Sequence, residues 1–161
     1  MSKYQLIERE RKFLLASEQV NTTGLRQKQI TDYYLSGARL RFRVVTDEEG
    51  QHYKLTQKSP ADAAGEAAIT TIYLNKQEFE LLNIFDAVIV SKTRYLLQSG
   101  QLVIGLDHYL TETDKLWLAE VEFSSTEEML GFELPLPRIG EVTGQPEYDG
   151  YALARRFQQI N

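Results

Sequence analysis

The chain of 161 residues contains no cysteine, which excludes a disulfide framework and a thiolate metal site. Histidine is also scarce, so any metal is expected to be a hard cation held by oxygen ligands. No apolar run approaches the length of a membrane span, and residues 1–5 lack the apolar core of a signal peptide. We therefore expect a protein of the reducing cytoplasm that does not associate with membranes.

A positive net charge is lacking as well. The formal charge of −5 argues against a nucleic-acid partner, because proteins that bind nucleic acids are normally basic. The 42% hydrophobic and 25% charged residues are typical of a soluble globular protein. The length fits one domain over residues 1–161.

Most of the sequence shows the period-two alternation of β-strands. Short links, such as 47–50 and 99–100, favour antiparallel pairing. The sequence therefore predicts a mainly β (α+β) fold, an eight-stranded antiparallel barrel with a few covering helices. The expected strands are 3–15, 27–35, 38–46, 51–58, 68–74, 87–98, 101–109 and 116–124.

Three helices are expected between or after these strands. One begins near Asn75 with a capping box to Glu78, and its apolar stripe continues through Phe79, Leu82 and either Ile84 or Phe85. A second starts at 124 or 125, and a third runs over 146–159. The stretch 59–67, rich in Ala, Pro and Gly, is expected to be a mobile loop.

Charged residues alternate with apolar ones in several strands. In the run 7–13, Glu8, Glu10 and Lys12 share one face at intervals of roughly 6–7 Å. For any single strand the simplest interpretation is that these charges face solvent. Taken together, however, each segment carries mostly one sign of charge, whereas surfaces usually mix signs. A concave site that binds a metal and a polyanion is the better interpretation of the set.

If this face lines the inside of the barrel, its charges are nearly balanced. A triphosphate accompanied by divalent cations would match such a lumen, with arginine forks on the phosphate oxygens. The apolar face would then point outward and need covering by the helices. The inward acids are Glu8, Glu10, Asp107, Glu120 and Glu122, and the inward bases are Lys12, Arg41, Arg43, Lys58, Lys92 and Arg94.

A set of short motifs resembles one known family. The run 8–12 resembles the ExExK signature of the CYTH family, the triphosphate tunnel metalloenzymes. The further matching segments are 34–35, 41–43, 55–58, 92–95, Asp107, 118–123, 141–144 and 148–154. The resemblance implies a tunnel-shaped barrel that binds a triphosphate-containing small molecule with Mg²⁺ or Mn²⁺ and hydrolyses it, with tripolyphosphate the expected substrate.

Carried over by motif position, the resemblance gives each lumen residue a role. Glu8, Glu10, Glu120 and Glu122 would hold metal or position the attacking water, with Asp107 as a further metal ligand or outer-shell residue. Lys12 would belong to the catalytic set and also bind phosphate. The remaining substrate-binding residues would be Arg41, Arg43, Lys58, Lys92 and Arg94.

The chain departs from the family pattern at four positions. Ile69, Thr71 and Gly105 stand where small relatives commonly carry acids, and Gly150 stands where an Asn is common. Two alternatives to hydrolysis therefore stay open. One is an adenylate cyclase of class IV type, and the other is a non-catalytic tunnel that binds polyphosphate or a nucleotide. An exposed barrel face would also allow a homodimer.

Overall fold

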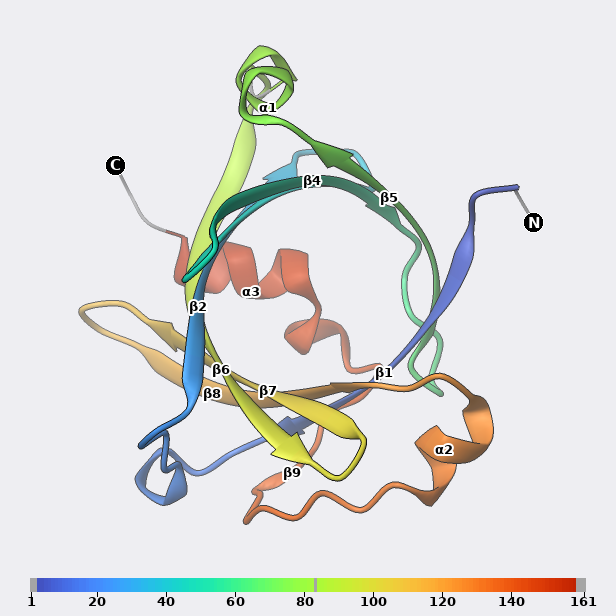
Figure 1. The fold of residues 1–161 in the computed structure, drawn as a ribbon, viewed down its shortest axis with the longest axis vertical. Coiled ribbons are helices and arrows are strands. Elements are labelled where there is room, and N and C mark those ends of the chain that lie inside the picture. The colour runs from blue at the N-terminus through green and yellow to red at the C-terminus, as the bar shows by residue number, and fades with distance from the viewer. Residues whose placement is uncertain (1–2, 83, 159–161) are drawn as a thin grey trace.

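The computed structural model describes residues 3–82 and 84–158. Within these ranges the chain forms a closed antiparallel β-barrel with short helices around it (Figure 1). The strands are β1 (Leu6–Leu14), β2 (Arg26–Leu35), β3 (Leu40–Asp47), β4 (Gly50–Lys58), β5 (Glu66–Leu74), β6 (Ala87–Ser99), β7 (Leu102–Leu110), β8 (Lys115–Glu122) and β9 (Gly140–Glu141). The helices are η1 (Ser17–Gln19), α1 (Lys76–Leu82), α2 (Thr126–Gly131), η2 (Pro146–Tyr148) and α3 (Gly150–Phe157).

The strand order β5-β4-β3-β2-β6-β7-β8-β1 closes because β1 also pairs with β5, with Leu6 opposite Ile69. The short strand β9 pairs with the end of β1. The expected barrel is thus confirmed, although β1 starts at Leu6 and not at residue 3. Gly50 and Gly100, in the two expected hairpin turns, adopt positive φ angles of 121° and 61°, which glycine tolerates best.

The caps expected from the sequence form at the first two helices. Asn75 and Glu78 make the reciprocal capping box at α1, where the Glu78 amide donates to Asn75 Oδ1 at 2.9 Å and the Asn75 amide to Glu78 Oε2 at 2.8 Å. Ser125 caps α2 by accepting from the Glu128 amide at 3.1 Å. The apolar stripe of α1 is shorter than expected, because the helix ends at Leu82 and leaves Ile84 and Phe85 exposed.

The apolar outer face of the barrel is covered in two places. Phe79 of α1 packs against the rings of Phe42 and Tyr53 on β3 and β4. A larger cluster lies between β1, β7, β8 and the segment around α2, and it includes the buried Phe13, Met129 and Leu134. This arrangement confirms the expected exterior that helices help to cover, and it leaves the charged face for the lumen.

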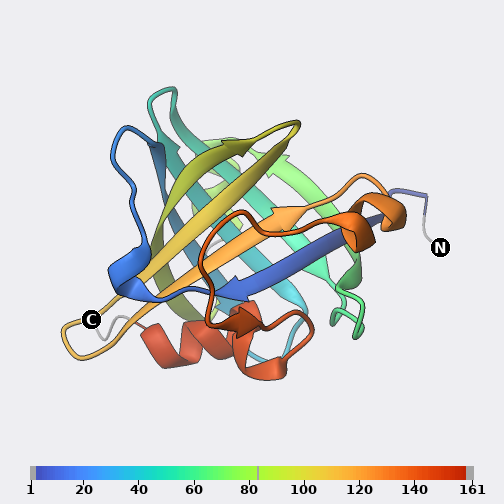
Figure 2. The ribbon, with the colours of Figure 1, turned by 90° about the horizontal axis from the view of Figure 1, so that it is seen from below.

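At one end of the barrel the inward face changes from charged to apolar. On β6 the inward position next to Lys92 is Val90, and on β8 the inward position next to Glu120 is Leu118. Both Val90 and Leu118 are buried against α3. Helix α3 contributes Leu153, Ala154 and Phe157 to this cluster, and Figures 1 and 2 show it across this end of the barrel. The expected third helix is therefore confirmed in two pieces, η2 and α3, while residue 159 lies outside the described part of the chain.

The loop between β4 and β5 has internal hydrogen bonds. Asp62 Oδ1 accepts from the amides of Ala64 and Glu66, both at 2.9 Å. Gly144 packs tightly on this loop, because a Cβ at residue 144 would lie 3.0 Å from the carbonyl oxygen of Asp62. The loop and the segment before η2 therefore lie together beside the lumen. In the described residues no helix is long and apolar enough to cross a membrane.

Candidate active site

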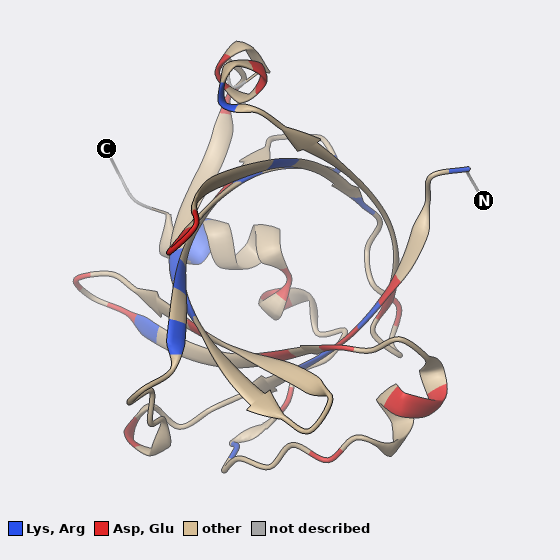
Figure 3. Ribbon diagram, viewed as in Figure 1, with Lys and Arg blue, Asp and Glu red and all other residues tan. Residues whose placement is uncertain are grey.

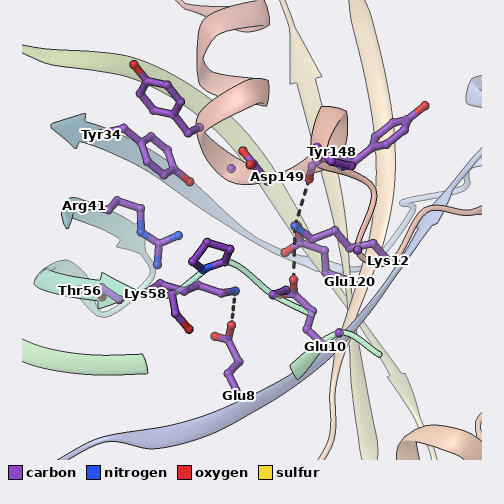
Figure 4. A pocket seen from close by; sticks show the side chains of 18 of the residues that line it. Glu8, Glu10, Lys12, Tyr34, Arg41, Thr56, Lys58, Glu120, Tyr148 and Asp149 are labelled. Carbon is purple, nitrogen blue, oxygen red and sulfur yellow. Dashed lines mark hydrogen bonds and ion pairs between the residues drawn. The ribbon is translucent and has the colours of Figure 1, made fainter. Parts of the chain in front are cut away.

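A cavity of about 450 Å³ occupies the lumen next to α3. Its wall combines charged side chains of the barrel strands with the loop after β4 and the segment from Val142 to Tyr151. Figure 3 shows the acidic and basic positions on the strands that surround the lumen, and Figure 4 shows Arg41 across the cavity from Glu10, with Lys58 reaching toward Glu8. The predicted site residues that line it are Glu8, Glu10, Lys12, Arg41, Arg43, Lys58, Lys92, Arg94, Glu120 and Glu122.

We call Glu8 and Glu10 of β1 together with Glu120 and Glu122 of β8 the acidic wall. The two strands pair antiparallel with Glu10 opposite Glu122 and Lys12 opposite Glu120, so their alternation brings all four carboxylates onto the lumen side. Lys12 Nζ lies 3.3 Å from Glu10 Oε1 and 3.4 Å from Glu120 Oε1. Burial lowers the pKa of Lys12, but Glu10 and Glu120 outweigh it and raise the pKa, which keeps the ammonium charged.

Glu122 differs from the rest of the acidic wall. Glu8 pairs with Lys58, Glu10 with Lys12, and Glu120 with Lys12, Lys92 and Arg94, whereas Glu122 has no ion-pair partner among the described residues. Solvent reaches Glu122 from the lumen. Burial within the wall and the carboxylates of Glu8 and Glu10 nevertheless raise its pKa. A positive charge bound here would relieve this repulsion.

The carboxylates of Glu8, Glu10 and Glu122 offer the oxygen donors that a hard divalent cation prefers, and burial together with their mutual repulsion raises the pKa of Glu122. Their ligand atoms are not gathered within 4.8 Å of one another, so a cation held by all three would require the side chains to move together. Glu120 is less available, since three cationic side chains surround it. A different acidic group, formed by Asp47, Glu49 and His52, lies on the β3–β4 hairpin with its ligand atoms within 4.8 Å of one another. That group does not line the cavity.

The basic wall consists of Arg41 and Arg43 on β3, Lys58 on β4, and Lys92 and Arg94 on β6. Asp32 on β2 is buried beside the two β3 arginines and forms ion pairs with both. Its Oδ1 and Oδ2 accept from Arg43 Nε at 2.6 Å and Nη2 at 2.7 Å, and Arg41 Nε lies 3.7 Å away. Such a bidentate pair fixes the direction of the guanidinium toward the lumen.

Asp107 on β7 forms the corresponding ion pairs with the two cations of β6, Lys92 and Arg94. It is fully buried, and it accepts from Arg94 Nε at 2.5 Å and Nη2 at 2.6 Å and from Lys92 Nζ. Arg94 also contacts Glu120. Lys92 and Arg94 therefore separate Asp107 from the cavity, which Asp107 does not line. The resemblance implied that Asp107 is a metal ligand, but direct ligation would require Lys92 and Arg94 to move away. The geometry agrees with the outer-shell alternative.

The residues at the positions that depart from the family pattern add no charge to the lumen or leave room for a neighbour. Ile69 and Thr71 lie opposite Lys58 and Thr56, so the inner face of β5 adds no carboxylate there. A Cβ at Gly105 would lie 2.9 Å from Arg94 Nε, which means that the missing side chain makes room for the guanidinium. At Gly150 a Cβ would lie 1.9 Å from the hydroxyl of Tyr34.

The fold and site together define a class, the closed antiparallel barrels whose lumen carries an acidic wall and a basic wall. The CYTH domain family model matches residues 6–134. This is well over half of the chain, and the protein therefore belongs to the CYTH family, the triphosphate tunnel family.

Several solved structures resemble the chain, whereas no curated protein matches it. The inorganic triphosphatase NE1496 is 29% identical, with a TM-score of 0.59 over 91% of this chain and 93% of that one. A second structure, described as the hypothetical protein NE1496, is 28% identical, with a TM-score of 0.59 over 91% of this chain and 97% of that one. HpAC1 from Hippeastrum, described as revealing a dominant triphosphatase activity, shares the fold at 12% identity, with a TM-score of 0.53 over 77% of this chain and 83% of that one.

Sequence reasoning gave no role in the site to Asp32 or Tyr34. Asp32 and Tyr34 alternate with Tyr33 on β2, a period-two signal that would have turned both side chains into the lumen. What the sequence did not provide was the register that places Asp32 opposite Arg43. Tyr34 lines the cavity, and its ring lies 5.9 Å from the guanidinium carbon of Arg41.

The Asp32 pair gives a test at acid pH. Burial alone would raise the pKa of Asp32, but Arg43 and Arg41 outweigh it and lower the pKa from 3.8 to about 2. Because the folded-state pKa is depressed, this stabilisation is present above about pH 4 and is lost as the pH falls toward 2. Roughly 2 kcal/mol of the free energy of unfolding should be lost over that window.

We expect the Asp32→Asn variant to lack this contribution, so its stability should approach that of the wild type as the pH falls. The measurement is urea unfolding at intervals from pH 6 to pH 2. The exposed Asp86→Asn variant is the control and should follow the wild type. Parallel curves for wild type and Asp32→Asn would contradict the assignment.

Proposed function

We propose that the protein hydrolyses a triphosphate-containing substrate in a metal-dependent reaction, and that tripolyphosphate is its preferred substrate. The observation that carries the proposal is the pairing of an acidic wall and a basic wall across one cavity of the lumen. The acids suit a cation, and the arginines and lysines suit phosphate oxygens. The 29% identity to an inorganic triphosphatase supports this substrate class.

In the proposed reaction the basic wall binds and orients the phosphates. Arg43 is fixed by Asp32, and Lys92 and Arg94 by Asp107, so these three charges need little rearrangement when the phosphates enter. Arg41 lies near Asp32, but its Nε is 3.7 Å away and makes no hydrogen bond in the described part of the chain. Lys58 and Lys12 extend the same surface toward the acidic wall. These groups neutralise the charge on the transferred phosphoryl group and on the leaving diphosphate.

The acidic wall serves the attacking water. Glu8, Glu10 and Glu122 would hold Mg²⁺ or Mn²⁺, which supplies Lewis-acid polarisation when bound. A carboxylate of this wall orients the water and accepts its proton. The water oxygen forms a bond to the terminal phosphorus while the bridging phosphorus–oxygen bond breaks, giving orthophosphate and diphosphate. No covalent enzyme intermediate is required.

The test is phosphate release from tripolyphosphate, thiamine triphosphate and ATP, with Mg²⁺, with Mn²⁺ or with EDTA. The wild type is compared with a Glu120→Gln/Glu122→Gln variant and with Glu127→Gln, an exposed acid on α2, as the matched control. We expect metal-dependent release that the double variant loses and the control keeps. Cyclic AMP with pyrophosphate from ATP would instead identify a cyclase, and binding without any product would identify a non-catalytic tunnel.

A further inference from the structure

The inward face of the barrel continues beyond the cavity, on the side away from α3. Lys58, Thr56 and Lys54 alternate along β4, so Lys54 lies about 13 Å from Lys58 along the strand, two steps of roughly 6–7 Å. Lys54 stands opposite Arg43 on β3 and opposite Tyr73 on β5. It therefore adjoins the basic wall without lining the cavity described above.

Lys54 is a partly buried inward cation that has no carboxylate partner among the described residues. Most of the other inward cations have a carboxylate within 4.0 Å, and these are Lys12 with Glu10, Lys28 with Asp47, Arg41 and Arg43 with Asp32, Lys58 with Glu8, and Lys92 and Arg94 with Asp107. Arg39, which lines the cavity without such a pair in the described residues, is exposed. The contact that Lys54 does make is with an aromatic ring, since its Nζ lies 5.2 Å from the centre of Tyr73.

The charges around Lys54 are mainly positive. Burial, followed by repulsion from Arg43 and Arg41, lowers the pKa of its ammonium, with Lys28 adding to the repulsion and Glu122 opposing it. A partly buried cation among like charges is costly unless an anion neutralises it. An anion bound between Lys54 and Arg43 would contact both cations and remove this cost.

We propose that Lys54, together with Arg43 and the ring of Tyr73, forms a subsite for one phosphate beyond the triphosphate. On this proposal, which rests on the proposed function, the lumen binds linear tetraphosphate more tightly than tripolyphosphate. A stacked nucleobase is less well supported. Tyr73 is 73% exposed, but Lys54 lies over one face of its ring and would compete with a base stacked there.

The test is calorimetric titration of the whole protein with tripolyphosphate and with linear tetraphosphate, in EDTA to suppress metal-dependent turnover. We expect the wild type to bind tetraphosphate about tenfold more tightly, the effect of one additional contact worth roughly 1.4 kcal/mol. Lys54→Met should remove this preference and leave the Kd for tripolyphosphate within about twofold. Lys54→Arg should keep it. Lys76→Met, at an exposed position on α1, is the matched control.

Three results would overturn the subsite. Equal wild-type affinities for the two ligands would refute it while leaving the proposed function intact. An equal loss of both affinities in Lys54→Met would place Lys54 in the triphosphate site itself. ATP binding that depends on Tyr73, measured with Tyr73→Ala, would assign the position to a nucleobase. If the wild type bound neither polyphosphate in EDTA, the subsite would fail, whereas the proposed function would still be decided by the metal-dependent release of phosphate.

Discussion

Replacing Glu122 with glutamine is expected to lower kcat/KM for tripolyphosphate by about 100- to 1,000-fold, the usual effect of removing one preorganised electrostatic group. Glu122 is the member of the acidic wall that has no ion-pair partner in the described residues, and it lies opposite Glu10. Its charge is therefore the one most available to a bound cation. Its loss should also weaken binding of Mg²⁺ or Mn²⁺ in the presence of the phosphate ligand.

The same substitution should leave the fold intact. The pKa of Glu122 is raised in the folded protein, so its ionised form costs stability once the pH rises above the ordinary glutamate value of 4.5. Glu122→Gln should therefore be at least as stable as the wild type at pH 7, and the difference should disappear as the pH falls below 4.5. Activity assays and urea unfolding of the same samples separate the two effects. An active variant, or one destabilised at neutral pH, would contradict the assignment.

The largest effect on stability is expected at Asp107. Asp107→Asn leaves the buried Lys92 and the partly buried Arg94 with Glu120, which Lys12 also contacts, as their remaining carboxylate partner in the described residues. Breaking a buried ion pair from one side typically costs about 3–5 kcal/mol, because part of the buried charge is left uncompensated. We expect a loss of this size in the free energy of unfolding, measured in urea at pH 7, together with a loss of activity.

Asp114→Asn is the matched control, because Asp114 forms an exposed pair with Arg156 at 2.7 Å. An exposed pair is worth about 1 kcal/mol at most. Added tripolyphosphate should restore part of the stability of Asp107→Asn, since phosphate can neutralise the uncompensated cations. Equal destabilisation by the two substitutions would show that Asp107 does not hold Lys92 and Arg94 as described.

The sequence predicts those features of the fold and site that depend on residues close together in the chain. The barrel is predictable because alternation, turn glycines and caps such as Asn75–Glu78 are local signals. The inward direction of Glu8 and Glu10 also follows from alternation, once it is decided which face is inside. The separation of positive and negative charge into largely different strands predicts that the charged face lines the lumen. The packing of Phe79 and Phe13 on the outer face agrees with this prediction.

Contacts between strands are what the sequence could not supply. The bond from Asp32 to Arg43 depends on the register of β2 and β3, and the burial of Asp107 depends on Arg94 lying over Gly105. Alternation in the sequence places Lys54 on one face with Thr56 and Lys58, but its lack of a counterion in the described residues appears only when every neighbouring strand is in place. The sequence therefore predicts which side chains point into the lumen, whereas their ion-pair partners are known only from the structure.

The two ends of the barrel are chemically unlike. One end carries the apolar cluster of α3 with Tyr34 and Tyr148, and the other carries Lys54 and Tyr73. Tripolyphosphate is a symmetric molecule whose terminal phosphates are equivalent in water. A tripolyphosphate bound in this lumen as proposed would lose the equivalence, because one terminal phosphate would face the α3 side and the other would face Lys54. The barrel would thereby distinguish the two ends of a symmetric ligand.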